Sequence, residues 1–212
     1  MTDQDDWVGL SDFLASMQFW RLVQQELAPS LGERGVELLL YEAPYLDGDR
    51  VRIPNGPANE RDSEGVRNHS ILQDPEGFSV RTSGLDRANE FTDIVEAWFG
   101  NFDLAAKYFL YQNVCTSTYG RLDQTGRRSL NALLKAEGLM SGWASRDVTG
   151  PTGHYPTDLY FNSANPAESY MTFNGDTRTS QVITKTFRQI NELYAAELGL
   201  DRLDIAIPDT TT

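Results

Sequence analysis

The sequence predicts a mixed α+β fold, with helices in the N-terminal, central and C-terminal parts of the chain and two or more short antiparallel hairpins. Three observations favour this class. Apolar residues recur with helical spacing in separate stretches, tight-turn residues separate short apolar runs, and 40% of the 212 residues are apolar. We expect one compact domain over residues 1–200, with exposed loops near 54–67 and 141–157, followed by an extended tail over residues 201–212.

The N-terminal part of the chain is expected to hold a helix, a strand and a hairpin. The helix should run from about Ser11, a residue that can cap it, to Leu27, and Pro29 should end it. The dense apolar run over residues 36–41 has the length of a strand. The pair Asp47-Gly48 favours a tight turn before the alternating residues 50–53, which predicts a first hairpin.

The central part of the chain is expected to begin with a second hairpin and to continue as helices. Residues 70–73 and 78–81 flank the turn sequence Asp74-Pro75-Glu76-Gly77. A helix with one buried face is predicted from apolar residues at i, i+3, i+4 and i+7, namely Phe91, Ile94, Val95 and Trp98. A further helix over residues 103–117 is apolar on more than one face, so it should lie between other elements or against another subunit. A third helix should run over residues 126–137 and end at Gly138.

The C-terminal part is expected to begin loop-like over residues 140–166. Short strands are predicted over residues 158–161 and 169–173. A helix should follow from about Ser180 and end at Gly199.

The tail is predicted to be an interface segment. Leu203, Ile205 and Ile207 alternate with Asp204 and Ala206, which suits an extended segment with one apolar edge. With Pro208, these apolar residues are predicted to dock on a neighbouring subunit. The alternative is that the tail packs on its own domain.

The charge of the chain disfavours several classes of partner. Asp and Glu number 31 against 18 Lys and Arg, a formal net charge of −13, which would repel a nucleic-acid backbone. No stretch is long and apolar enough to predict a membrane span, and the acidic N-terminus is unlike a secretory signal. We therefore expect a protein that is not secreted by a signal peptide.

No motif predicts an enzyme. With one cysteine, two histidines and no HExxH, the chain lacks the usual ligand spacing of a zinc site. The phosphate-binding patterns GxxxxGK[ST] and GxGxxG are absent, and so is the nucleophile pattern GxSxG. No catalytic residue, cofactor or metal ligand is predicted.

The composition instead favours association. Aromatic residues, which are enriched at the centre of protein interfaces, make up 11% of the chain. We expect a non-enzymatic structural or assembly subunit whose partners are copies of itself and other proteins of a complex. Two alternatives stay open: an enzyme whose site gathers Tyr, Arg and Asp from residues 140–178, and an acidic winged-helix-like regulator whose recognition helix opens with Arg127 and Arg128.

The acidic, lysine-poor composition resembles that of proteins from salt-loving archaea, whose acidic surfaces stay hydrated when salt screens their self-repulsion. It is also similar to that of virion proteins from tailed viruses of halophilic hosts. This resemblance implies a head-to-tail connector or a tail protein, found in the host cytoplasm or in the virion. An acidic protein of a GC-rich bacterium or its phage is the alternative source.

Overall fold

The fold is an antiparallel sheet with helices packed around one central helix. The computed structural model describes residues 7–56, 67–86, 89–122, 130–149, 156–172, 176–200 and 203–210. Eight strands form one sheet in the order β1-β2-β3-β4-β5-β8-β7-β6, with every neighbouring pair antiparallel. The predicted α+β class is therefore confirmed.

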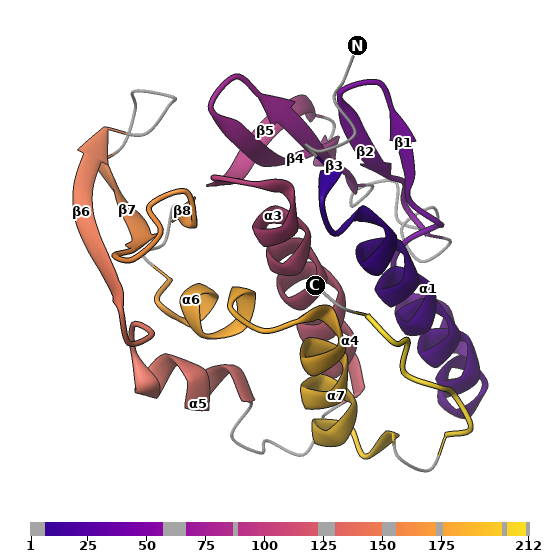
Figure 1. Cartoon of the computed structure of the whole chain (residues 1–212). Coiled ribbons are helices and arrows are strands. Elements are labelled where there is room, and N and C mark those ends of the chain that lie inside the picture. The colour runs from indigo at the N-terminus through magenta and orange to yellow at the C-terminus, as the bar shows by residue number, and fades with distance from the viewer. Residues whose placement is uncertain are drawn as a thin grey trace.

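Figure 1 shows strands β1 to β5 at the top of the view and β6 to β8 at its left, with the helices below and to the right. The strands are β1 (Tyr45–Asp47), β2 (Arg50–Ile53), β3 (Arg67–Asp74), β4 (Gly77–Asp86), β5 (Asn89–Phe99), β6 (Trp143–Thr149), β7 (Pro156–Asn162) and β8 (Ser169–Thr172). The helical elements are α1 (Leu10–Leu27), the 3-10 segment η2 (Ala28–Leu38), α3 (Phe102–Phe109), the π-helical turn η3 (Leu110–Cys115), α4 (Thr116–Leu122), α5 (Leu130–Glu137), α6 (Arg178–Ile183) and α7 (Phe187–Glu197).

Both predicted hairpins are present. Asp47 pairs with Arg50 across the turn at Gly48, which has a φ of 63°. Asp74 pairs with Gly77 across the second turn. Gly77 has a φ of 150°, and a Cβ there would lie 2.3 Å from a carbonyl oxygen of β5, so only glycine fits this turn.

The helix predicted around the apolar stripe from Phe91 to Trp98 is wrong, because this segment is strand β5. The register of β5 on β4 shifts twice, between Val80 and Arg81 and between Thr82 and Gly84. Such bulges insert extra residues into a strand and break its alternation of faces. The apolar residues of β5 therefore imitate a helical period, and Ile94 is 52% exposed rather than buried.

Three further expectations need correction. Residues 36–41 form no strand: the 3-10 segment continues to Leu38, and Tyr41 makes only an isolated bridge with Asn55. The loop expected near 141–157 is instead occupied by β6 from Trp143, an edge strand with exposed polar residues at its centre. The helix expected from Ser180 to Gly199 is two helices, because a capping box between Thr186 and Gln189 begins α7 separately.

Other predicted boundaries agree with the structure. The N-terminal helix is confirmed, although Gly9 rather than a polar side chain precedes it. Gly138 and Gly199 lie just after helices with positive φ values of 74° and 64°. Residues 57–66 of the first predicted loop and residues 150–155 of the second lie outside the described residues, as do Arg127 and Arg128 of the winged-helix alternative.

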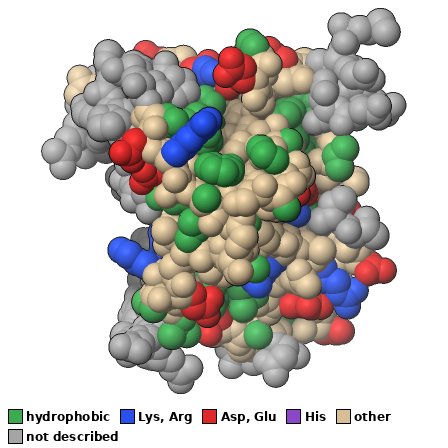
Figure 2. All heavy atoms as spheres, turned by 60° about the vertical axis from the view of Figure 1, so that its left-hand side comes forward, with side chains coloured by type: hydrophobic (Ala, Val, Ile, Leu, Met, Phe, Trp, Pro, Cys, Tyr) green, Lys and Arg blue, Asp and Glu red, His purple; other side chains and the backbone are tan. Residues whose placement is uncertain are grey.

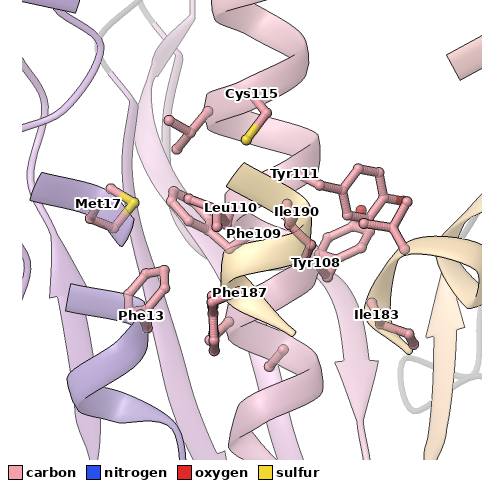
Figure 3. Close-up of a cluster of buried hydrophobic side chains, with 14 of the residues drawn as sticks. Phe13, Met17, Tyr108, Phe109, Leu110, Tyr111, Cys115, Ile183, Phe187 and Ile190 are labelled. Carbon is pink, nitrogen blue, oxygen red and sulfur yellow. The ribbon is translucent and has the colours of Figure 1, made fainter. Parts of the chain in front are cut away.

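The core surrounds the continuous helical segment formed by α3, η3 and α4. Contacts link α3 to β3, β4 and β5 on one side and to α1 and α6 on others, while η3 contacts α1 and α7. Figure 3 shows Phe109, Leu110 and Cys115 of this segment among Phe13 of α1 and Ile190 of α7. The two-faced apolar helix predicted from the sequence thus lies between elements of its own chain.

A buried hydrogen-bond chain joins the first helix to the last. The indole Nε1 of Trp20 donates to Asn191 Oδ1 at 2.9 Å, and Asn191 Nδ2 donates to Ser16 Oγ at 2.9 Å. All three residues are buried. This chain fixes α1 against α7, since a buried polar group left without its partner would cost about 1–3 kcal/mol.

The buried tyrosines are expected to make the fold sensitive to alkali. Burial is the main cause that raises the pKa of Tyr111, Tyr170 and Tyr194 above the ordinary value of 10.0. Because these side chains ionise first in the unfolded chain, the stabilisation is complete below pH 10 and falls as pH rises above it. We expect tyrosinate absorbance to increase together with the loss of near-ultraviolet circular dichroism. Complete ionisation with an intact circular dichroism spectrum would contradict this expectation.

None of the helices in the described part of the chain combines the length and the hydropathy that crossing a bilayer requires.

Candidate binding sites

A polar pocket of about 690 Å³ lies between the sheet and the central helix. This volume is within the range of small-molecule sites, roughly 300–1,000 Å³. Its walls come from β4, β5, β8, α3, η3, α5 and the start of α6. The lining residues are Thr82, Ile94, Val95, Glu96, Tyr108, Gln112, Asn113, Lys135, Thr172, Asp176, Thr177 and Arg178.

A bulge shapes the sheet wall of this pocket. Arg81 pairs with Val95 and Val80 pairs with Ala97, so Glu96 is the extra residue of β5. Bulges commonly redirect a side chain next to a functional site. The Glu96 carboxylate lies 3.5 Å from His69 Nε2 on β3, and His69 is 7% exposed. The bulge at Glu96 therefore brings a carboxylate and an imidazole together beside the pocket.

The π-helical turn η3 forms the opposite wall. Its residues Leu110, Tyr111, Val114 and Cys115 are buried, and the two residues between them, Gln112 and Asn113, line the pocket. π-helical turns occur frequently at functional sites. In this protein the turn presents two neighbouring amide side chains to one cavity.

At the start of α6, the pocket is lined by an ion pair between Asp176 and Arg178. The guanidinium of Arg178 donates to both carboxylate oxygens of Asp176, through Nε at 2.8 and 3.0 Å and through Nη2 at 2.5 Å. The two charges therefore satisfy one another. Lys135, an exposed residue of α5, is the remaining cation among the described lining residues.

The hydroxyl of Tyr108 on α3, which lines the pocket, stays protonated there. Burial is the largest cause that raises the pKa of its hydroxyl, and the negative charge of Glu96 adds to the effect. The ring of Tyr108 lies 5.6 Å from that of Tyr111, edge to face. The pocket thus holds a neutral phenol beside a carboxylate.

A second hollow, of about 480 Å³, lies on the other face of the sheet. The register places Trp98 of β5, Met171 of β8 and Leu159 of β7 in one row across three strands. Ala97 and Phe99, on either side of Trp98, are buried, whereas the three side chains of the row are partly exposed. We call this row, with Val95, the outer apolar row.

Charged groups lie beside the outer apolar row. Asp74, Glu76 and Arg81 line the same hollow, and Arg81 Nη2 donates to Asp74 Oδ1 at 2.8 Å. Figure 2 brings the side that carries β6 and β7 forward and shows hydrophobic side chains gathered near its middle, with charged side chains mostly toward its margins.

The predicted tail residues lie on their own domain in the structure. Leu203, Ile205 and Ile207 are half-buried against the core and line a groove with Phe19 and Val23 of α1. Asp204 and Ala206 are exposed, so the predicted alternation is present. Pro208 follows as a half-buried residue. Docking of these residues on a neighbouring subunit stays a prediction.

Other sequence-based candidates are only partly brought together. From the pool of Tyr, Arg and Asp over residues 140–178, the structure places Asp176 and Arg178 at the polar pocket. In the described part of the chain, no group of three or more His, Cys, Asp or Glu could hold a metal ion. Sequence reasoning missed Gln112, Asn113 and Glu96, although two adjacent amides inside an apolar helix were a usable signal.

Comparison with known proteins defines the architecture and no more. No protein-family model matches the chain, and no curated protein matches it. Its mixed fold does match a solved structure, described as Rv3902c from M. tuberculosis, with a TM-score of 0.50 and 14% sequence identity. The match covers 75% of this chain and 83% of that one. At this identity the likeness shows a shared fold alone.

Proposed function

We propose that this protein is a non-enzymatic binding subunit whose outer apolar row docks on a partner protein of net positive charge. The observation that carries the proposal is the alignment of Trp98, Met171 and Leu159 in one partly exposed row across three strands. A tryptophan within an apolar patch is a common centre of protein interfaces. Contiguous exposed apolar side chains on a folded protein often mark such a contact.

Charge decides between two kinds of partner. Two copies of a chain with a net charge of −13 repel each other at low salt, whereas a basic protein is attracted and associates faster. Glu76, an exposed residue at the edge of the same hollow, places negative charge beside the row. A basic partner therefore fits this surface better than a second copy does. The expectation of a virion component from a halophilic host stays a prediction.

The test is affinity capture from the cells that naturally make the protein, at low and at molar salt, followed by reconstitution with the purified partner. Trp98→Ser should abolish capture of a basic protein, because removing a central interface tryptophan commonly costs about 2 kcal/mol or more of binding free energy. The variant should stay folded, because Trp98 is only partly buried.

Ile94→Ser is the matched control. Ile94 is an exposed apolar residue of the same strand, and it lines the polar pocket instead of the outer hollow. The proposal requires that this variant retain the partner. It is refuted if Trp98→Ser and the wild-type protein capture the same proteins, or if the captured partner is acidic.

A further inference from the structure

The polar pocket contains more hydrogen-bonding groups than the described residues use. Thr82 is 6% exposed, and its Oγ1 has no hydrogen-bond partner in the described part of the chain. The same holds for Gln112 Oε1 and Asn113 Nδ2, which are also buried. Each such atom costs about 1–3 kcal/mol of folding free energy, so three around one cavity call for an explanation. A bound group with N–H donors would supply partners for Thr82 Oγ1 and Gln112 Oε1, whereas Asn113 Nδ2 is itself a donor and is not served by such a group.

The charges around the pocket favour a cation. Both oxygens of Asp176 are occupied by Arg178, so this pair adds little net field. Glu96 has only the 3.5 Å contact with His69 among the ion pairs of the described residues, and its side chain is 26% exposed. Lys135 opposes a cation, but it is an exposed residue of α5 and its long side chain can turn into solvent. The net charge of −13 adds to the attraction.

The arrangement of acceptors selects among cations. Glu96, Gln112 and Thr82 line the cavity from three different elements, β5, η3 and β4. A guanidinium group carries five N–H donors in one plane and can serve several acceptors at once, whereas an ammonium is a compact point charge. Tyr108, whose ring packs against those of Phe99 and Tyr111, lines the same pocket.

We propose that the polar pocket binds a guanidinium group, whose N–H groups donate hydrogen bonds to the side-chain oxygens of Glu96, Gln112 and Thr82. The amide and hydroxyl atoms are buried in the structure, so binding requires that these side chains rotate toward the cavity. The group could belong to a free small molecule such as arginine or to an arginine side chain of another protein. Val95 lines both hollows, but Trp98, Met171 and Leu159 of the outer apolar row do not line this pocket, and the proposal does not depend on them.

The first test is calorimetric titration of the full chain with methylguanidine, free L-arginine and the peptide Gly-Arg-Gly. We expect binding of at least one, and a loss of about tenfold or more in affinity in Glu96→Gln, since tenfold corresponds to about 1.4 kcal/mol. The matched control is Glu90→Gln, which removes the same charge from an exposed position of the same strand. This control should change the affinity less than about twofold.

A second variant keeps the test independent of folding defects. Thr82→Val preserves the shape of the side chain and removes a hydroxyl that has no partner, so it should raise the melting temperature of the free protein while weakening guanidinium binding. A purely structural Thr82 would show the opposite change in melting temperature. Tighter binding of the peptide than of arginine identifies a protein side chain as the source, and the reverse order identifies a small molecule.

Three results would overturn the proposal. The first is that none of the three probes binds at millimolar concentration. The second is equal loss of affinity in Glu96→Gln and Glu90→Gln. The third is that uncharged glucose binds as tightly as the guanidinium probes. Trp98→Ser should leave all of these titrations unchanged, so failure of this site and failure of the outer apolar row can be distinguished.

Discussion

Phe109→Ala is expected to lower the free energy of unfolding by about 3–5 kcal/mol, the range measured when a buried phenylalanine is removed from a well-packed core. Phe109 is 0% exposed and lies where the sheet, α1 and the central helix meet. Its ring centroid is 5.3 Å from those of Tyr41 and His69 and 6.2 Å from that of Phe13. Removal of the ring therefore leaves a cavity with contributions from three elements, which cannot collapse without moving one of them.

Urea unfolding followed by circular dichroism measures this effect. The control is Leu133→Ala on α5, where the leucine is 46% exposed and the change should stay within about 0.5 kcal/mol. A loss below about 1 kcal/mol in Phe109→Ala would show that the central helix is less tightly packed than its burial indicates.

Replacing Leu203, Ile205 and Ile207 together with serine is expected to lower the stability of the monomer by about 2–4 kcal/mol, because three half-buried aliphatic side chains lose their contact with α1 and α7. Phe19 and Val23, now 4% and 1% exposed, would face solvent. Thermal unfolding and light scattering of the same samples report the stability and the mass of the particle.

The alternation within the tail supplies the control. Serine at Asp204 and Ala206, which are exposed, should change the melting temperature little. If the triple variant keeps the wild-type melting temperature but loses an oligomer that the wild type forms, then the tail acts as the attachment arm that the sequence predicted. If the monomer melts earlier, the tail is a cover for its own core.

Local chemistry explains which parts of the fold could be predicted. The turns at Asp47-Gly48 and at Asp74 to Gly77 need only the residues of the turn itself, and both hairpins are present. The helix ends at Gly138 and Gly199 likewise depend on one residue with positive φ. The alternation of the tail was also correct, since side chains of an extended segment point to opposite sides regardless of what they contact.

The errors occur where tertiary pairing overrides local pattern. The apolar residues of β5 have a helical period in the sequence, and two bulges allow a strand to accommodate it. No local signal reveals that β4 and β8 pair with this strand. The polar pocket could not be predicted for the same reason, because Thr82, Gln112 and Arg178 meet only after the sheet and helices have packed. The one feature of the sequence that indicated this pocket was the pair of adjacent amide residues within an apolar helix.

The position of β8 has a consequence for how the chain folds. The pairings from β1 to β5 and between β6 and β7 join strands that follow one another in sequence, so each set can form from nearby residues. The link between the two sets is the short ladder that joins residues 97–99 to residues 170–172. Closing it brings together residues far apart in the sequence, which costs more chain entropy than the pairings between successive strands. Before that ladder closes, β5 and β8 each have an open edge with which another chain can pair, so we expect mispairing to begin at this ladder.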